Sequence, residues 1–470
     1  MIVYGVLRAI GRLALRWFYR DVEVVGTNRI PDEGPALLAS NHPNALVDAL
    51  VIGCTLRRPV TLTAKATLLG HPITRVLLRL TGVVPLRRAS DVLAAGPATP
   101  DPSRNDTAFA AVLDVLESGG MVLLFPEGKS HSDPSLAPLK TGLARIALMA
   151  RDERGLASVP IIPIGLTFER KWDPRSRVLL RVGIPIHMDD DAPNAVEAVA
   201  SLTRRVDAGL RDVTLNFPTS DEARRVLAIS ATVAEVLDDF RSLDAPDPPL
   251  ADSVAVAQRI SAIVPRLTDL ALPLRTRVEQ FLDHLGHFET ILHLNMIAAG
   301  DVQMSTRTAP GVWFAVRELL IGVVGGPFAL WGRVNHWVPL RIARAIALKI
   351  SRYDDEPAMN TIIAGVVLVL AFYTAQIGVI AWQLGGWLAL VYAASLPASA
   401  TWDFRYADRL RRAAARVRTY FRLRRDPMLH AQLRKDLDWL RNEATALDAL
   451  VGGAAVAPIT THADRSSVGA

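Results

Sequence analysis

The chain has 470 residues, half of them hydrophobic, and its 53 lysines and arginines outnumber 47 aspartates and glutamates to give a formal net charge of +6. This length allows roughly two to four domains, and the basic balance suits an anionic partner such as a lipid headgroup, a phosphorylated substrate or nucleic acid. Its single cysteine, Cys54, excludes a disulfide framework and a thiolate metal site, and fits a reducing compartment.

Residues 1–21 are predicted to form an amphipathic helix in the membrane interface. Arg8, Arg12, Arg16 and Arg20 recur every four residues, so they form one basic stripe, and apolar side chains cover most of the remaining surface. A core helix with a solvated stripe is the alternative. Arginines interrupt the apolar run and no small-residue cleavage site follows, so we do not expect a cleavable signal peptide.

Residues 22–190 alternate short apolar runs with segments of helical pattern. This alternation predicts an α/β domain, a mixed sheet flanked by helices, with the functional site at the strand ends. The expected strands are 35–40, 60–65, 121–128, 159–168 and 177–186, and the expected helices are 108–119 and 141–153.

The second half of the chain is predicted to be helical and attached to a membrane. Residues 191–310 carry long helical patterns, and 311–402 form the membrane region, because no charged residue or histidine occurs between 357 and 402. A bilayer pass needs about 20 apolar residues, so we expect a transmembrane helical hairpin at about 360–401 with its turn at 383–387. The shorter apolar run 319–331 is expected to be re-entrant or interfacial.

Basic clusters precede and follow this hairpin. They predict that both ends of the hairpin, and the α/β domain with them, lie on the cytoplasmic face of the membrane. In a bacterium this would be the plasma or inner membrane. Residues 403–450 read as basic amphipathic helices that would attract anionic lipid, and residues 451–470 as a disordered tail.

The stretch 40–48, SNHPNALVD, places a histidine and an aspartate around a predicted helix start. Pro43 disfavours the helical conformation for His42 and is itself well placed in a first helical turn. His42 would then lie before the helix and Asp48 inside it, so that their side chains can converge. A carboxylate on one ring nitrogen leaves the other free to accept a proton. A histidine that caps a helix, with Asp48 solvated, is the alternative.

Three further stretches accompany this pair. In GVVPLRR, an arginine follows a glycine by six positions; in FPEGKSHS, a glycine and a lysine follow a buried strand; and VPIIPIGLTF is an apolar strand with an internal proline. Glycine allows backbone N–H groups to approach an anion, and Lys129 supplies positive charge. Taken singly, an arginine after a strand is commonly a solvated strand end and a Glu-Gly turn is common, so only the combination and order of the stretches are specific. The residues concerned are Gly82, Arg88, Glu127, Gly128, Lys129, Ser130 and Pro163.

In this order, the four stretches resemble the glycerolipid acyltransferase family, which includes glycerol-3-phosphate and 1-acylglycerol-3-phosphate acyltransferases. The resemblance covers roughly residues 30–190. Its blocks are matched by Asn41, His42 and Asp48, by Gly82 and Arg88, by Phe125, Pro126, Glu127 and Gly128, and by Pro163. Five residues, PNALV, separate the histidine from the aspartate, where the commonest form has four. This spacing resembles fungal-type glycerol-3-phosphate/dihydroxyacetone-phosphate acyltransferases, which also carry C-terminal membrane segments. Pro85 replaces the usual phenylalanine of the second block, and Lys129 and Ser130 replace the usual Thr-Arg or Thr-Ser.

The resemblance implies a membrane-bound O-acyltransferase of phospholipid biosynthesis. His42, oriented by Asp48, would deprotonate a hydroxyl of glycerol-3-phosphate or lysophosphatidate, which attacks the thioester of acyl-CoA or acyl carrier protein. No cofactor or metal is expected beyond this co-substrate. Arg88 and Lys129 would hold the acceptor phosphate, and Glu127 would order the glycerol or the loop. Asn44, Gly82, Gly128 and Ser130 complete the predicted substrate-binding set, and Lys65 and Lys140 are weaker phosphate candidates.

Other classes of function fit less well. The residues of KSHSD are too close in sequence to form a hydrolase triad, and no Gly-x-Ser-x-Gly elbow occurs. The histidines do not fall into metal-ligand spacings, and no nucleic-acid reader motif is present. A lysophospholipid-remodelling acyltransferase and a non-catalytic lipid-binding membrane protein of the same fold remain as alternatives.

Overall fold

The computed structural model describes residues 2–65, 82–86, 103–188, 193–238, 248–263, 271–304, 306, 308–452 and 465–467. The chain divides into two compact units. The first contains residues 1–216, 343–366 and 461–470, and the second contains residues 217–342 and 367–460.

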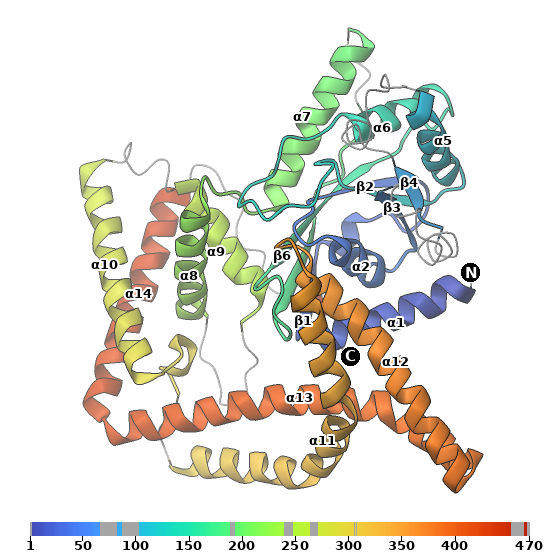
Figure 1. The fold of residues 1–470 in the computed structure, drawn as a ribbon. Coiled ribbons are helices and arrows are strands. Elements are labelled where there is room, and N and C mark those ends of the chain that lie inside the picture. Colours follow the sequence, from blue (N-terminus) through green and yellow to red (C-terminus); the bar gives the residue numbers. More distant parts are fainter. Residues whose placement is uncertain are drawn as a thin grey trace. The chain divides into compact units, whose positions relative to one another are not determined.

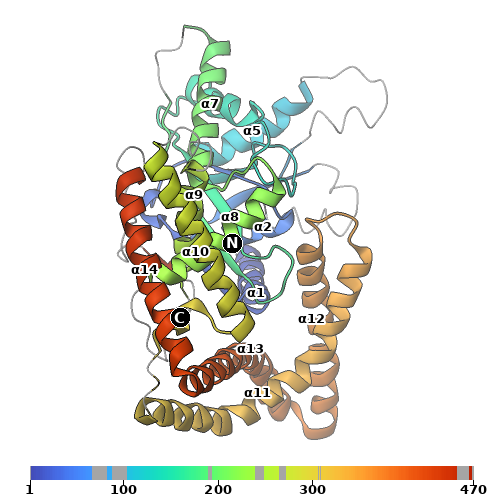
Figure 2. The same cartoon turned by 90° about the vertical axis from the view of Figure 1, so that its left-hand side faces the viewer.

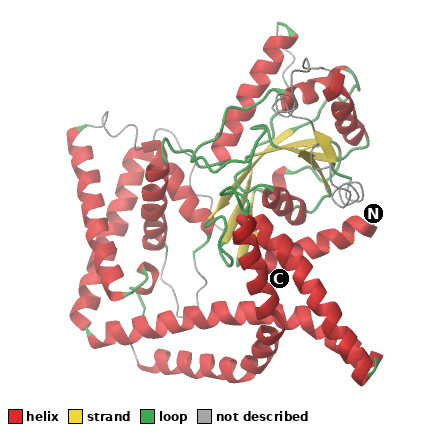
Figure 3. Ribbon diagram, in the orientation of Figure 1, coloured by secondary structure: helices red, strands yellow, loops and turns green. Residues whose placement is uncertain are grey.

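An eight-stranded mixed sheet forms the centre of the first unit (Figure 3). Its order is β4 (Val84–Leu86), β3 (Val60–Lys65), β5 (Met121–Leu124), β2 (Ala36–Ser40), β6 (Ile161–Phe168), β7 (Arg177–Val182), β1 (Asp21–Val25) and β8 (Arg465–Ser467). The five strands from β4 to β6 run parallel, β7 is antiparallel to β6, and β1 is parallel to β7. The carboxyl ends of β3, β5, β2 and β6 therefore meet at one edge, where ligands bind in open α/β sheets.

Helices cover both faces of this sheet, which confirms the predicted α/β class (Figure 1). Side chains alternate along each strand, so Leu38 faces one core while Leu37 faces the other. The first core includes α1 (Ile2–Phe18) and α2 (Leu46–Thr55), and the second includes α5 (Ser103–Glu117), α6 (Gly142–Asp152) and α7 (Ala195–Val213). Fully buried side chains of this size each stabilise a fold by about 1.5–3 kcal/mol.

The N-terminal helix α1 uses part of its basic stripe inside the first unit. Leu15 and Phe18 are buried, Arg12 Nε donates to the carbonyl oxygen of Cys54 at 2.8 Å, and Arg8 donates to that of Leu56. Both carbonyls belong to the C-terminal end of α2, where a positive charge is stabilising. The stripe is thus not wholly solvated, and contact of the outer face with a membrane stays a prediction.

The second unit contains a helical bundle. Its helices α8 (Ser220–Leu237), α9 (Leu250–Ile263), α10 (Leu272–Asn295) and α14 (Pro427–Gly452) lie side by side in both views (Figures 1 and 2). They share a core in which Phe288 is 0% exposed and Leu433 and Leu440 are equally buried. The helical character predicted for 191–310 holds for the described residues, and the tail predicted to be disordered lies largely outside them.

In chain order, three long helices follow α10 and precede α14. They are α11 (Thr308–Ile350), α12 (Pro357–Leu384) and α13 (Gly386–Arg425). The turn between α12 and α13 is at Gly385, whose φ of 91° favours glycine, as the run QLGGW predicts. In the part of the chain that the structure describes, two helices are long and apolar enough to cross a membrane, 311–350 and 357–384.

This pair differs from the predicted hairpin. The apolar run 319–331 is no separate short segment, because it continues into one helix of 43 residues. The predicted second arm lies at the start of α13, where Asp403 ends an apolar stretch that begins at Gly386. That stretch is shorter than the roughly 20 residues a pass requires. Which helices cross a membrane stays a prediction.

In the second unit, α11 and α13 pack closely and antiparallel. A Cβ at Gly332 would lie 2.2 Å from the carbonyl oxygen of Ser399, so only glycine permits this approach. The amide of Asn335 connects α11 to both neighbouring helices, since its Oδ1 accepts from Gln376 Nε2 at 3.3 Å and from Tyr392 Oη at 2.8 Å. These bonds tie α11 to α12 and to α13.

Candidate active site

The site is built on the five residues between β2 and α2, which lie at the carboxyl edge of the parallel strands. Asn41 continues the sheet beyond β2: its Oδ1 accepts from Leu166 N at 2.8 Å, and its Nδ2 donates to Leu166 O at 3.0 Å. These bonds fix the backbone directly before His42. The helix begins at Leu46, three residues after Pro43, and places Asp48 in its first turn.

His42 and Asp48 form the predicted pair. His42 Nδ1 lies 2.9 Å from Asp48 Oδ2, and their side chains are 11% and 0% exposed. Because the ionised carboxylate can only accept, Nδ1 carries the proton and Nε2 is left as the basic nitrogen. The imidazole also stacks on Phe125, with ring centres 3.8 Å apart and planes at 12°. Its orientation is therefore fixed by a hydrogen bond and by packing.

The carboxylate of Asp48 is held from its own loop as well. Its Oδ2 also accepts from the backbone N–H of Asn44 at 2.7 Å. Burial raises the pKa of Asp48 above its ordinary value, and the hydrogen bonds from His42 and from the Asn44 N–H oppose this rise. The pair thus contains a buried acid whose charge depends on its neighbours.

One residue of the five-residue spacer has an unusual backbone conformation. Ala45 has φ 46° and ψ −132°, a region that side chains with a Cβ rarely adopt and that costs about 1–3 kcal/mol. Ser130 Oγ accepts from the Ala45 N–H at 3.0 Å. Ser130 is predicted to bind substrate; the structure shows that its hydroxyl holds the spacer.

The side chain of Asn44, a residue of the same loop, points into the protein. It is 1% exposed, and its Nδ2 donates to Lys171 O at 3.1 Å and to Tyr19 Oη at 3.3 Å. This position corrects the prediction of substrate contact, because the amide is buried and engaged within the protein. Tyr19 is itself 1% exposed, and burial, followed by the charge of Asp48, raises the pKa of its hydroxyl. The sequence carries no signal for Tyr19, which directly follows α1 and lies far from the loop along the chain.

Glu127 orders the loop, one of its two predicted roles. It is 3% exposed; its Oε1 accepts from the backbone N–H of His42 at 2.9 Å, and its Oε2 accepts from that of Ala137 at 2.8 Å. Oε2 also pairs with His131 Nε2, while the His131 N–H donates to His42 O at 3.1 Å. The Glu127 carboxylate therefore joins the loop that carries His42 to residues 131–137. His131 is a site residue that sequence reasoning missed, although KSHSD contains it.

The turn after β5 presents two lysines. Gly128 has φ 75°, and its N–H donates to Phe125 O at 3.0 Å, so this glycine is required by the turn and its own N–H is occupied. Lys129 is exposed. A Cβ at Gly128 would lie 3.4 Å from Lys140 Cγ, so Lys140 runs alongside the same turn. Both amines lie on the loop that Glu127 ties to His42.

The second predicted block is described only in part. Gly82 has φ 68° and precedes β4, in accordance with a turn there. Arg88 lies outside the described residues, and the side chain of Lys65, at the end of β3, is not described either. Pro163 lies within β6 and pairs with Ala39 of β2, so it is part of the sheet.

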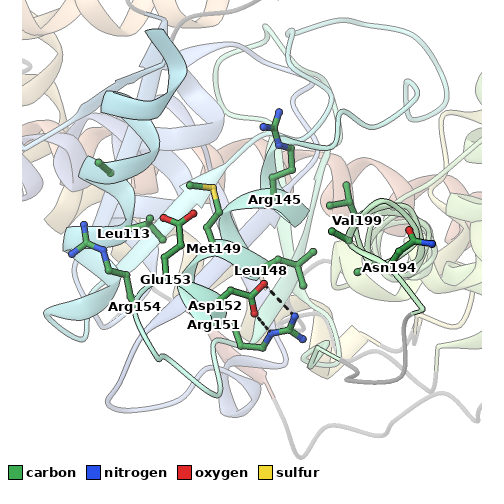
Figure 4. Close-up of a pocket in the computed structure, with 13 residues that line it drawn as sticks. Leu113, Arg145, Leu148, Met149, Arg151, Asp152, Glu153, Arg154, Asn194 and Val199 are labelled. Atoms are coloured by element: carbon green, nitrogen blue, oxygen red, sulfur yellow. Dashed lines mark hydrogen bonds and ion pairs between the residues drawn. The ribbon is translucent and has the colours of Figure 1, made fainter. Parts of the chain in front are cut away.

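A pocket of about 910 Å³ lies elsewhere in the first unit, between α5, α6 and the start of α7 (Figure 4). Its lining includes Arg145, Met149 and Asn194, together with Arg151 and Asp152, which form an ion pair at 2.7 Å. Neither His42 nor Asp48 lines it, so this pocket is separate from the pair.

Comparison with known proteins shows which families and relatives this chain resembles. A family model described as Acyltransferase matches residues 21–167. The glycerol-3-phosphate O-acyltransferase 2 of Saccharomyces cerevisiae is 37% identical over 124 residues, which are 25% of this chain and 16% of that protein. The 1-acyl-sn-glycerol-3-phosphate acyltransferase alpha of Mus musculus is 27% identical over 195 residues, 39% of this chain and 61% of that protein. The chain thus spans less than two thirds of either relative.

A solved structure is also similar, that of the 1-acyl-sn-glycerophosphate acyltransferase PlsC from Thermotoga maritima. The two share 20% sequence identity, with a TM-score of 0.32 over 44% of this chain and 79% of that one. The family model covers β1 to β6, and with them His42, Asp48 and the Phe125–Gly128 turn. Residues 21–167 of this chain are therefore similar to the Acyltransferase family over the part that carries the His42–Asp48 pair.

Proposed function

We propose that the chain is a membrane-bound enzyme that transfers a fatty acyl group from acyl-CoA or acyl carrier protein to a hydroxyl of glycerol-3-phosphate or lysophosphatidate. The observation that carries this proposal is the His42–Asp48 pair at the edge where parallel strands end, with Nδ1 held at 2.9 Å and Nε2 left as the basic nitrogen. The names of the yeast and mouse relatives support the class of acceptor.

The proposed reaction needs no covalent enzyme intermediate. His42 Nε2 accepts the proton of the acceptor hydroxyl as its oxygen attacks the thioester carbonyl carbon. The tetrahedral intermediate then collapses, the C–S bond breaks, and the thiolate takes the proton from His42 to leave as a thiol. Cys54 is buried, and burial raises the pKa of its thiol to about 11, which does not suit a nucleophilic role.

The acceptor phosphate would bind at the turn after β5. Lys129 and Lys140 supply amines on the loop that Glu127 connects to His42, and Arg88 would add a guanidinium from the second block. A phosphate held there would place the adjacent glycerol hydroxyl at the imidazole. The apolar helices α11 and α12 would keep the enzyme at the membrane, where its lipid product is released.

Membranes that contain the full chain test this proposal when they are incubated with labelled acyl-CoA and one acceptor at a time. We expect labelled lysophosphatidate from glycerol-3-phosphate, or labelled phosphatidate from lysophosphatidate. K129A should raise the KM for the phosphorylated acceptor and leave the KM for acyl-CoA unchanged. Transfer only to non-phosphorylated lysophospholipids would favour a remodelling enzyme. Lipid binding without any transfer would favour a non-catalytic protein and would overturn the proposal.

A further inference from the structure

The segment that follows β5 binds the backbone of His42 at two points. Glu127 Oε1 accepts from the His42 N–H at 2.9 Å. The His131 N–H donates to the His42 carbonyl oxygen at 3.1 Å. Both backbone polar groups of His42 are therefore bound to residues only four positions apart, although His42 itself follows a different strand, β2.

The Glu127 side chain is fixed in turn by the ring of His131. The two side chains are 1% and 11% exposed, and His131 Nε2 hydrogen-bonds to Glu127 Oε2, which also accepts from the Ala137 N–H at 2.8 Å. Among the residues that the structure describes, His131 is the only one whose side chain bonds to this carboxylate. A buried carboxylate without enough donors is costly, so the imidazole stabilises Glu127 where it lies.

The partners of the two ring nitrogens of His131 differ. An ionised carboxylate only accepts, so Nε2 carries the proton and donates it to Glu127. Nδ1 lies 3.3 Å from Asp133 N and 3.1 Å from Asp133 Oδ2, and the Asp133 side chain is 67% exposed. An ion pair with an exposed group contributes little. The contact that fixes the loop is therefore the one made by Nε2.

The rest of the segment is held by other bonds. Ser135 Oγ donates to Asn216 Oδ1 at 3.2 Å, and both residues belong to the first unit. The Lys140 N–H donates to Pro126 O at 2.7 Å. Removing the ring of His131 should therefore leave the segment attached and the protein folded, so its effect on the base can be measured separately.

We propose that His131 is a positioning residue of the proposed acyl transfer. Its Nε2–H holds the Glu127 carboxylate, and that carboxylate and the His131 N–H together fix the backbone of His42. His131 also lies in the segment that carries Lys129 and Lys140, the amines proposed to bind the acceptor phosphate, so the same contact sets the position of the base relative to that phosphate. This inference rests on the proposed function, since the base and the phosphate site are those of that proposal.

The expected consequence of losing this contact is a loss of alignment and not of substrate binding. A general base acts only within hydrogen-bond reach of the proton it accepts, and a displacement of about 1 Å can lower the rate by about 10²-fold. Because His131 acts on the position of the base, its loss should lower kcat and leave the KM for acyl-CoA unchanged. A residue that only supports folding would instead lower thermal stability and leave kcat per folded molecule unchanged.

The experiment compares the full chain in detergent with H131Q, H131N and H131A. The amide nitrogen of glutamine reaches as far as Nε2 and can replace the donor to Glu127, whereas that of asparagine reaches only as far as Nδ1. S135A is the matched control, because it removes a different bond of the same segment. Rates of acyl transfer give kcat per folded molecule and the KM for acyl-CoA, and thermal unfolding gives stability. Hydrogen–deuterium exchange of the peptide that contains the His42 N–H needs no substrate and reports how firmly that N–H is bound.

We expect H131N and H131A to lower kcat by roughly 10–10²-fold with an unchanged KM for acyl-CoA, and H131Q and S135A to stay within about threefold of wild type. Exchange at the His42 N–H should be faster in the first two variants and close to the wild-type rate in the other two. Equal losses of kcat in H131Q and H131N, or unchanged exchange in H131A, would overturn the proposal and leave His131 a structural residue. If no acceptor is acylated by the wild-type chain, the proposed function fails, whereas the exchange rates still decide whether His131 fixes the backbone of His42.

Discussion

The two units each contain a largely enclosed histidine with hydrogen-bonded partners, and the comparison separates the proposed base from a structural group. In the first unit, His42 Nδ1 is bound to Asp48, and Nε2 has no hydrogen-bond partner among the described residues. In the second unit, His336 is 2% exposed; its Nδ1 lies 2.7 Å from Gly332 O, and its Nε2 bonds to Tyr373 Oη. Both imidazoles are fixed, but of these two only His42 keeps a nitrogen for a substrate.

The difference shows that burial and partners alone do not mark a catalytic histidine. The partner of His42 is a carboxylate, which can stabilise a positive ring during proton transfer, while the partners of His336 are a carbonyl and a hydroxyl. The second arrangement joins α11 to α12, as the neighbouring Asn335 also does. The proposed proton transfer therefore concerns the first site, whereas the bonds of His336 join helices in the second.

The largest expected effect is on catalysis at the first site. H42Q should lower kcat by about 10²–10⁴-fold, because general-base catalysis contributes about that much. Initial rates of acyl transfer at saturating substrate measure the loss, with thermal unfolding as a check that the protein folds. A variant that retains more than a tenth of the wild-type rate would contradict the role of His42 as base.

D48N should lower kcat by about 10–10³-fold and also raise the free energy of unfolding at neutral pH. Because burial raises the pKa of Asp48, the folded state favours its protonated form; the stability linked to this group is full below its ordinary pKa and is lost as pH rises through the folded value. An uncharged amide avoids that loss. Urea unfolding at pH 7 and near pH 4 checks the sign: the variant's advantage should shrink at the lower pH.

At the second site, H336L should change stability and leave chemistry alone. The substitution removes the partner of Tyr373 Oη in a half-buried position, which costs about 1–3 kcal/mol of the free energy of unfolding. Thermal unfolding in detergent measures this, and kcat per folded molecule should stay within about twofold of wild type. A much larger fall in kcat with unchanged thermal unfolding would contradict the purely structural role of His336.

The smallest effects concern the loop that carries His42. A45G should stabilise the chain by about 1 kcal/mol or less, because glycine adopts φ 46° without strain, and S130A should destabilise it by a similar amount by removing the acceptor of the Ala45 N–H. Thermal unfolding of both variants and of the double variant measures their coupling. If A45G proved less stable than wild type, the strain at this position would not limit stability.

The sequence predicted those parts of the site that follow from strand ends and proline. A histidine before Pro43 cannot easily continue a helix, and parallel strands bring the ends of β2 and β5 together. The pattern therefore allowed His42 and Asp48 to converge near Glu127, but it left a helix-capping histidine open, and the resemblance to the acyltransferase family favoured the pair. The contacts of Asn44 and Ser130 could not be predicted, because they depend on which way a short polar side chain turns in a loop. His131 and Lys171 come together with the pair only through long-range packing.

In the predicted membrane region, too, the sequence predicted what local residues determine and missed what depends on packing. The turn at Gly385 follows from QLGGW, since local glycine chemistry fixes it. The extent of α11 did not follow, because Pro327 and Pro339 interrupt the helical pattern although the helix continues through both. Neighbouring helices can compensate for the hydrogen bonds that a proline removes, and no single segment reveals such compensation.

The bonds from Arg8 and Arg12 to the end of α2 have a practical consequence for protein production. Residues 2–18 resemble a dispensable membrane tether, and trimming them is an obvious route to a more soluble enzyme. The trimmed chain would lose the two guanidinium groups of α1 that bind the C-terminal end of α2, the helix that carries Asp48. It would also lose the buried side chains of Leu15 and Phe18. A purified but inactive truncation would then report a damaged active site and not a requirement for lipid.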